Sequence, residues 1–398
     1  MQVRNQTYLR MKNKEDIINL LREKSRSYSE IARILRLSNT AVGKIADDLI
    51  ADNLIKRESD TKGRTGITLS INADYGYVIA VDLSGKELNV CAADFDGKIL
   101  IRRTISEVLQ FERKDFDSII QTMSEMMQES ILLNKKLCCI CVASPGRFTS
   151  SGEILLNPRF VGFENISIKR VLEEKFNCEV IIKNDVNLAM VGEKACGEVL
   201  KDVSNAIMLH LDVGTGAAIM LNGKIFEGNN GFAGEIGYFN LNMTSVYSDN
   251  FENLTYSNIY DSTSLYSCLK VISREISVES KGYWGKYITE NRISPKDITI
   301  KNMVEAYVTG DEITRRIINA AGRIIGRVAW NITESLDVDM IVLNGAVVNL
   351  GDDFLKVVES FSQKTVKYSA LMDRATLTGA VYVGLSKAFK NGIKVNND

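Results

Sequence analysis

Lys183-Asn184-Asp185-Val186-Asn187 follows a short apolar stretch at 179–182 and opens a segment with helical character that reaches about residue 196. This order predicts a strand, a turn and a helix, with Asp185 at the end of the strand. A carboxylate at such a position can act as a general base toward a hydroxyl group. Asn184 beside it offers both a donor and an acceptor, which suits a sugar hydroxyl. The alternative is that Asp185 is only the N-cap of the helix.

A second motif, Gly234-Glu235-Ile236-Gly237-Tyr238, carries a carboxylate between two glycines. Because glycine has no side chain, a ligand can approach the backbone beside Glu235 closely. The alternative is a solvated loop charge that binds nothing.

Three turns of small residues each follow an apolar strand. They are Asp82-Leu83-Ser84-Gly85-Lys86, Val213-Gly214-Thr215-Gly216 and Asn344-Gly345-Ala346. The backbone N–H groups of such turns can bind a phosphate. For the first turn, a plain β-hairpin is the alternative interpretation.

The order of apolar segments places these motifs in an α/β body. Strands are expected at 77–83, 88–95, 98–105, 137–143, 179–182, 206–211, 217–222 and 340–343, and helices at about 114–133, 185–196 and 311–336. Two successive sets of strands and helices are typical of two α/β lobes with a cleft between them. Residues 240–264, rich in Asn, Ser, Tyr and Asp, are expected to form a long surface loop or an insertion.

The first 72 residues have a different pattern. Helical spacing predicts helices at 14–24, 28–35 and 39–52, with Ser29 and Ser38 as N-caps of the second and third. Alternating residues at 55–57 and 67–71 predict a hairpin around the turn at 62–66. Three helices and a hairpin make a winged helix-turn-helix. A three-helix bundle without a ligand is the alternative.

Several residues of this head suit contact with DNA. The third helix begins with Ser38, Asn39, Thr40, Gly43 and Lys44, which are small or polar enough for the major groove. At the wing tip, Arg64 lies between glycines and can reach a phosphate or the minor groove. Residues 1–72 carry 14 Lys/Arg against nine Asp/Glu, a net charge of +5, and the rest carries 35 against 41, a net charge of −6. A basic head on an acidic body is typical of nucleic-acid binding.

Composition excludes several other classes of protein. Hydrophobic residues make up 45% of the chain and charged residues 25%, as in globular proteins. The length of 398 residues favours two or three domains. No apolar run is long enough for a membrane helix, and Met1 to Lys14 lacks the apolar core of a signal peptide, so a cytoplasmic protein is expected. The seven cysteines form no CxxC pair, and His210 is the only histidine. The cluster Cys138-Cys139-x-Cys141 is expected to be buried and inert in a strand.

The motifs together resemble those of the ROK family (repressor, open reading frame, kinase), over nearly the whole chain. The head-plus-body layout is similar to that of the family's xylose and N-acetylglucosamine repressor branch. The resemblance implies an actin/hexokinase-like ATPase fold, in which the three turns are the phosphate-1, phosphate-2 and adenosine segments. It also implies that Asp185 is the base that family kinases use, and that Glu235 binds the sugar.

Departures from the family pattern carry as much information. The first phosphate turn lacks a glycine and the threonine, and Asp212 and Ala218 occupy glycine positions of the second. An acidic Asp212 repels phosphate, which argues against ATP with Mg²⁺ as a cofactor, whereas Lys86 in the first turn could instead hold an anion.

Two further departures concern the metal and the sugar. Tyr238 replaces the family's zinc-binding histidine, and the family's cysteine segment is missing, so no zinc is expected. Arg159 stands where the family has a sugar-binding asparagine. It favours an acidic or phosphorylated sugar, or pairs with Asp185 or Glu235.

The sequence therefore predicts a sugar-responsive DNA-binding transcriptional regulator of carbohydrate genes, and specifically a repressor. The expected domains are the head at 1–72, a first lobe at 73–185 that a C-terminal helix at 385–398 rejoins, and a second lobe at 186–384 with the dimerisation surface. Expected partners are operator DNA, a sugar or sugar-phosphate effector, and further copies of the chain, as a dimer or a dimer of dimers. The alternatives are an ATP-dependent sugar kinase with an appended DNA-binding domain, and a partner-binding protein whose two sites have decayed.

Overall fold

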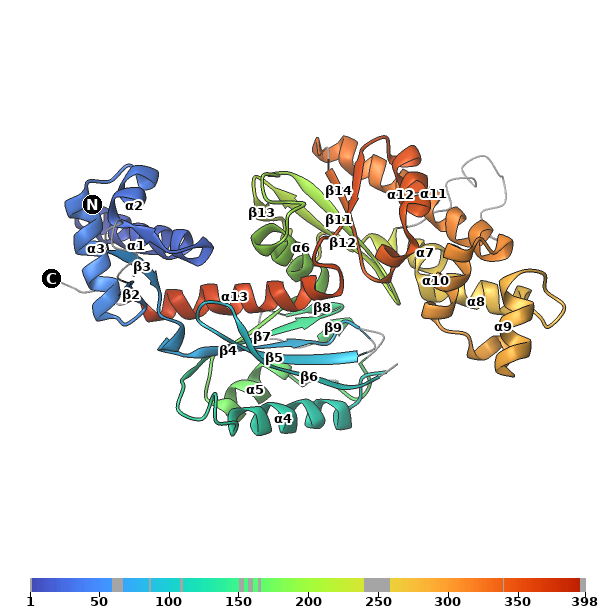
Figure 1. The fold of residues 1–398 in the computed structure, drawn as a ribbon, viewed down its shortest axis with the longest axis horizontal. Helices are drawn as coiled ribbons and strands as arrows, with labels where there is room; N and C mark the ends of the chain where they lie inside the picture. Colours follow the sequence, from blue (N-terminus) through green and yellow to red (C-terminus); the bar gives the residue numbers. More distant parts are fainter. Residues whose placement is uncertain are drawn as a thin grey trace. The chain divides into compact units, whose positions relative to one another are not determined.

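The structure is a computed structural model, and it describes residues 2–58, 67–85, 87–107, 110–149, 154–156, 160–163, 166–239, 258–338 and 340–393. The chain forms two compact units (Figure 1). Met1–Lys183 and Ala380–Asp398 make up the first unit, and Asn184–Gly379 makes up the second.

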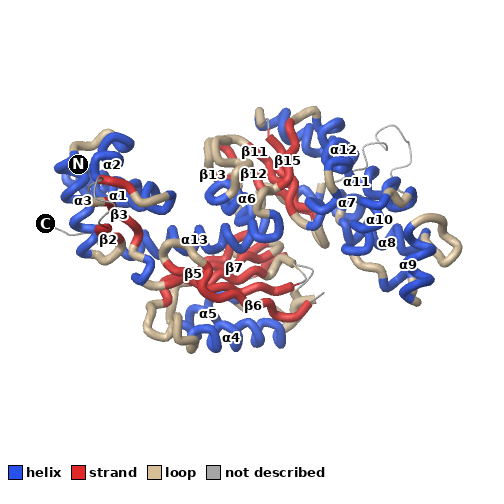
Figure 2. The backbone as a smooth tube through the Cα atoms, in the orientation of Figure 1, coloured by secondary structure: helices blue, strands red, loops and turns tan. Residues whose placement is uncertain are grey.

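The head of the first unit has the predicted winged helix-turn-helix architecture. Its helices are α1 (Gln2–Glu23), α2 (Tyr28–Leu35) and α3 (Asn39–Ala51), and its small sheet has the order β1 (Arg26–Ser27), β3 (Thr68–Ile71), β2 (Ile55–Glu58) (Figure 2). Fully buried Ile17, Ile31, Val42 and Leu49 join the three helices in one core. The wing tip, with Arg64, lies outside the described residues.

The helix starts of the head partly match the predictions. Ser38 caps α3, where its Oγ accepts the Ala41 N–H at 3.1 Å. The prediction of Ser29 as the cap of α2 is wrong. Ser27 caps this helix in a reciprocal capping box, in which Glu30 accepts the Ser27 N–H at 2.8 Å. This backbone hydrogen bond and the Ser27 hydroxyl hold the pKa of Glu30 below its ordinary value.

The body of the first unit is built on a five-stranded sheet with the order β10 (Val180–Asn184), β7 (Leu137–Ser144), β4 (Tyr77–Asp82), β5 (Glu87–Asp94), β6 (Ile99–Glu107). β4 pairs with β7 in parallel and with β5 antiparallel. Helices α4 (Arg113–Met127) and α5 (Ile168–Phe176) cover one face and α13 (Ala375–Gly392) the other (Figure 1). β8 (Arg147–Phe148) and β9 (Ile154–Leu156) form a separate pair.

The second unit has its own five-stranded sheet, with the order β13 (Lys224–Ile225), β12 (Thr215–Leu221), β11 (Ala206–Leu211), β14 (Met340–Asn344), β15 (Thr365–Tyr368). Alternate residues of β11 face opposite sides. Met208 packs with Ala189 and Met190 of α6 (Asp185–Cys196). Leu209 packs on the other side with Ile318 and Ile325 of α11 (Glu312–Leu336).

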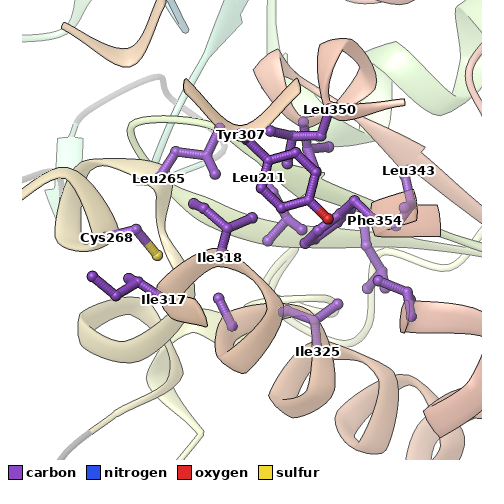
Figure 3. Close-up of a cluster of buried hydrophobic side chains, with 14 of the residues drawn as sticks. Leu211, Leu265, Cys268, Tyr307, Ile317, Ile318, Ile325, Leu343, Leu350 and Phe354 are labelled. Atoms are coloured by element: carbon purple, nitrogen blue, oxygen red, sulfur yellow. The ribbon is translucent and has the colours of Figure 1, made fainter. Parts of the chain in front are cut away.

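The larger core of the second unit involves most of its helices. Figure 3 shows Ile317, Ile318 and Ile325 of α11 gathered with Leu211, Tyr307 and Phe354. The remaining helices are α7 (Ile259–Thr263), α8 (Leu265–Glu275), α9 (Tyr283–Asn291), α10 (Ile300–Thr309) and α12 (Asp352–Ser362). α7 lies within the stretch predicted as a long surface loop or an insertion, so the loop alternative is wrong at the C-terminal end of this stretch. Residues 240–257 lie outside the described part. None of the described helices has an apolar stretch that could cross a membrane.

Candidate functional site

The start of α6 carries the first carboxylate motif. Asn184 is the N-cap, because its Oδ1 accepts the N–H groups of Val186 at 3.0 Å and Asn187 at 3.1 Å. The alternative that placed Asp185 at the cap is therefore wrong. It also follows that the amide oxygen of Asn184 is already engaged, so this side chain would bind a ligand through its NH₂ group.

Asp185 lies in the first turn of α6 with only 7% of its surface exposed. Its Oδ1 accepts the Val186 N–H at 2.9 Å, which fixes the orientation of the carboxylate. A buried, oriented carboxylate suits both hydrogen bonding to a hydroxyl and general-base chemistry.

Asn187, the fourth residue of the same motif, was not selected from the sequence. Its side chain is 6% exposed, and its Oδ1 is one of three buried side-chain atoms in the described chain that have no hydrogen-bond partner. A buried amide oxygen without a donor is unfavourable, so a donor that enters this site would stabilise it. Only the three-dimensional burial reveals this property.

The glutamate loop packs on the start of β12 in the same unit. Ala217 N–H donates to the Gly234 carbonyl at 2.8 Å, and a Cβ at Gly234 would overlap with the Ala217 carbonyl oxygen. A Cβ at Gly237 would lie 2.6 Å from the Thr215 carbonyl oxygen. Glycine is therefore required on both sides of Glu235 for this close approach, and Gly234 also has a φ of +92°.

The same strand contacts α6. A Cβ at Gly216 would lie 3.4 Å from a methyl carbon of Val186, directly after Asp185. The structure thus brings the two carboxylate motifs to the same end of β12. Tyr238 ends the loop in the short helix η2 (Ile236–Tyr238) with half of its surface exposed. Arg159, the other predicted sugar contact, lies outside the described residues.

The second and third small-residue turns lie next to each other. Asp212 begins the β11–β12 turn that holds Gly214 and Gly216, and its two carboxylate oxygens accept the N–H groups of Val213 at 2.8 Å and Ala346 at 3.3 Å. Ala346 begins η6 (Ala346–Leu350) after Gly345. The Asp212 carboxylate thus occupies backbone donors that a phosphate would need and adds a like charge. These residues do not fit the phosphates of a nucleotide.

The Gly345 turn is further fixed by a polar network. His210 Nδ1 is 2.9 Å from Asn344 Oδ1, and Asn344 Nδ2 donates to the Met372 carbonyl at 3.1 Å. Because Asn344 Nδ2 is the donor to Met372, Asn344 Oδ1 is the acceptor of the hydrogen bond from His210 Nδ1.

The first small-residue turn belongs to the other unit. It connects the antiparallel strands β4 and β5 in a hairpin, a geometry that both interpretations of this turn allow. Asp82 Oδ1 accepts the N–H and the hydroxyl of Ser84 at 2.9 Å and 2.6 Å. Gly85 follows Ser84, and Lys86 lies outside the described residues.

Metal ligands do not gather among the described residues, where no group of three or more His, Cys, Asp or Glu side chains could hold an ion. Burial raises the pKa of the Cys91 and Cys139 thiols to about 12, which keeps them protonated. Position 238 is a tyrosine, and the sequence has no cysteine between it and Cys268, which is itself buried in the core. These residues do not fit the zinc site of the family.

The candidate DNA interface is the N-terminal end of α3. Asn39, Thr40 and Lys44 are exposed there, and Gly43 faces open space. Asp47 is also exposed one turn after Lys44 and pairs with Arg57 of β2 at 2.5 Å. This neutralised acid was not expected from the sequence.

An ionic cluster that sequence reasoning missed holds α3 on α1. The Lys14 ammonium, only 2% exposed as a residue, lies 3.5 Å from the Asp48 carboxylate and 3.6 Å from that of Asp52. Arg10 joins Asp48 at 2.9 Å. These pairs connect α3 to α1, but their signal in the sequence is only a spacing of charges on two separate helices.

Comparison with known proteins fits this arrangement. The ROK family model matches residues 78–382. The chain is 24% identical to the xylose repressor of Caldicellulosiruptor bescii over 401 residues, which is 96% of this chain and 97% of that one. It is also 24% identical to the DNA-binding transcriptional dual regulator NagC of Escherichia coli (strain K12) over 342 residues, 83% of this chain and 79% of NagC.

Solved structures share the fold. A ROK family transcriptional regulator, described as a homolog of the E. coli MLC protein, superposes with a TM-score of 0.77 at 18% identity and covers 97% of this chain and 98% of its own. A ROK family glucokinase from Streptomyces griseus, in complex with glucose and AMPPNP, gives a TM-score of 0.64 at 18% identity over 78% of this chain and 99% of its own. With the family model covering most of the chain, the protein belongs to the ROK family.

Proposed function

We propose that the protein is a DNA-binding transcriptional repressor of carbohydrate genes, whose operator affinity falls when a sugar binds in the second unit. The observation that carries the proposal is the presence, in one chain, of a winged helix-turn-helix head and a retained pair of sugar-site motifs around Asp185 and Glu235.

The DNA-binding part of the proposal rests on α3. Its exposed N-terminal residues Ser38, Asn39, Thr40 and Lys44 suit base edges and phosphates, and Gly43 allows close approach. The xylose repressor and NagC are named as regulators, and the match to the xylose repressor covers 96% of the chain, so it includes the N-terminal head. A two-fold operator calls for a homodimer or a dimer of dimers. The regulator would act in the cytoplasm, beside the chromosome.

The sugar-binding part rests on the first turn of α6. Asp185 and Asn187 are buried acceptors there, and the Glu235 loop packs on the neighbouring strand. Acceptors of this kind suit the hydroxyl groups of a sugar. Tyr238 and Arg159 complete the proposed set. Relatives named xylose repressor and N-acetylglucosamine repressor make D-xylose and N-acetyl-D-glucosamine the first candidates.

A kinase function is the second candidate, and the retained Asp185 favours it. The Asp212 carboxylate speaks against it, because it binds the Ala346 N–H at the turn that would contact the nucleotide. We propose no cofactor: neither zinc nor ATP with Mg²⁺.

The test measures the operator Kd of the full chain on DNA from upstream of its own gene, with and without each sugar. We expect D-xylose, N-acetyl-D-glucosamine or a phosphate of one of these sugars to weaken binding. Asp185→Asn should blunt this response, because it removes the charge that strengthens hydrogen bonds to the ligand. Asp202→Asn, at an exposed loop position of the same unit, is the control and should respond normally.

Three outcomes separate the candidates. ATP-dependent phosphorylation of a hexose that Asp185→Asn abolishes would favour the kinase. Operator binding without any response to sugars or sugar phosphates would leave only the DNA-binding half of the proposal. Failure to bind any genomic fragment would contradict the repressor function and favour a partner-binding protein.

A further inference from the structure

Arg22, near the end of α1, joins the DNA-binding head to the second half of α13. Its Nη1 donates to Ser386 Oγ at 2.8 Å, and its Nη2 donates to the Tyr382 carbonyl at 3.1 Å. The guanidinium also lies over the Tyr382 ring, 3.8 Å from the centroid, and 5.6 Å from that of Phe389. One side chain thus combines two directional hydrogen bonds with a cation–π contact.

The half of α13 that Arg22 grips is fixed on the sheet of the first unit. The rings of Phe389 and Phe95 pack edge to face at 4.8 Å between centroids. Lys387 and Asn391 both bind the Glu179 carboxylate, at 2.9 Å and 2.7 Å. Arg22 therefore joins the head to a helix that is itself packed on the sheet of the first unit.

The same helix begins in the second unit, where it crosses α6 in close contact. A Cβ at Gly379 would overlap with the Leu188 carbonyl oxygen, and one at Gly192 would overlap with that of Ala375. These two glycines let the backbones of α13 and α6 touch, so neither helix can shift there alone.

A buried carboxylate strengthens this crossing. Glu193 of α6 is fully buried, and its Oε2 accepts the Ser369 hydroxyl at 2.6 Å and the Leu371 N–H at 3.2 Å, just before α13. α6 is also the helix whose first turn holds Asp185 and Asn187. The site occupies the first turn of α6, and the contacts with α13 and the residues just before it follow on the same short helix, from Leu188 to Glu193.

We propose that α13 relays changes at α6 to the DNA-binding head, and that Arg22 is the positioning residue that couples the head to this helix. A helix is a stiff element, and each of its two ends is held by specific contacts. A ligand that moves α6 would then bias the orientation of α1 and α3. The proposal deepens the proposed function, but its test needs neither operator nor sugar, so the two can fail separately.

The test is hydrogen–deuterium exchange of the full-length protein, read in peptides from α6, α13, α1 and α3. Gly379→Ala perturbs the crossing in the second unit. Gly384→Ala is the matched control on the same helix, because a Cβ there would lie 3.5 Å from its nearest neighbour, an ordinary contact. Arg22→Met removes the coupling residue at nearly constant length, and Arg22→Lys keeps the charge.

We expect Gly379→Ala to raise exchange in α6 and in the first turns of α13, and also, by several-fold, in α1. Gly384→Ala should leave α1 unchanged. Arg22→Met should raise exchange in α1 by about tenfold, in line with the loss of a charged hydrogen-bonding group, and Arg22→Lys should recover part of it. In the double variant Arg22→Met/Gly379→Ala, the exchange of α1 should be the same as in Arg22→Met alone.

Two results would overturn the relay. The first is faster exchange in α6 of Gly379→Ala with wild-type exchange in α1. The second is an equal rise of exchange in α1 when Gly379→Ala is made in the wild type and in the Arg22→Met variant. A general loss of stability would give this result. If Gly379→Ala does not fold, Glu193→Gln perturbs the same crossing through its hydrogen bonds to Ser369 and Leu371, and the same two results decide.

Discussion

The first turn of α6 and the turn at Asp212 lie in the same unit but treat their polar groups in opposite ways. At α6, the buried amide oxygen of Asn187 has no donor among the described residues, and Asp185 is buried beside it. At the other turn, both oxygens of Asp212 accept backbone N–H groups of the protein itself. At α6, acceptors suited to hydroxyl groups are present in a buried site. At the Asp212 turn, the backbone donors suited to a phosphate are already hydrogen-bonded to the protein's own carboxylate.

The largest expected effect concerns the glutamate loop, which lies near the first turn of α6. Gly234→Ala should lower the free energy of unfolding by about 3–4 kcal/mol, because the new methyl group would overlap with the Ala217 carbonyl at a φ that disfavours alanine. The measurement is urea unfolding, followed by a spectroscopic signal from the second unit. Gly231→Ala, with φ +78° and open space, should cost only about 1–2 kcal/mol. Equal losses for the two variants would mean that the glutamate loop does not pack on β12.

The next effect concerns the closed turn. Asp212→Ala should lower the free energy of unfolding by about 2 kcal/mol, because the partly buried N–H groups of Val213 and Ala346 lose their acceptor. Thermal unfolding with and without Mg-ATP checks both stability and nucleotide binding. The wild type should show no shift with Mg-ATP, and Asp202→Ala serves as the surface control. A clear nucleotide shift in the wild type would contradict the role assigned to Asp212.

A smaller effect tests the head. Lys44→Ala should weaken binding to all DNA sequences and reduce the slope of log K against log salt by about 0.9, the value for one phosphate contact. Affinities at several salt concentrations give this slope. Lys286→Ala, an exposed lysine of the second unit, should leave it unchanged. An unaltered slope for Lys44→Ala would exclude a phosphate contact at this position.

The last prediction is that the protein binds no zinc. Elemental analysis of the purified protein should find no stoichiometric zinc, because Tyr238 offers no imidazole and the cysteine segment of the family is missing. Dialysis against a chelator should leave the unfolding temperature unchanged. One zinc per chain, with a loss of stability on chelation, would show that other residues bind the metal.

Local signals predicted the elements of this protein well. The Ser38 cap, the strand–helix junction at Asp185 and the long helix that ends at Leu336 all follow from residues close in the chain. The misassigned Ser29 has a local reason as well. Ser27 and Glu30 are spaced as a capping box, and this reciprocal bond outweighs the better position of Ser29 before the apolar residues.

Contacts between distant residues could not be predicted in this way. Asp212 meets Ala346 across 134 positions, and Arg22 meets Tyr382 across 360. Nothing in the residues beside Asp212 tells whether its oxygens face a ligand or a backbone N–H of the protein. The unpaired oxygen of Asn187 is likewise a property of burial, which depends on the packed neighbours of α6.

The first unit is made of two chain segments, and the whole second unit is inserted between them. During synthesis, residues 380–392 therefore emerge only after the second unit has been made. Arg22 and Phe95 therefore lack their partners Tyr382 and Phe389 during that time. The later contacts must close a loop that contains the whole second unit. The second unit can fold as it is translated, whereas the docking of the head must be a late step. A nascent chain would thus dock its head on α13 only after the second unit is complete.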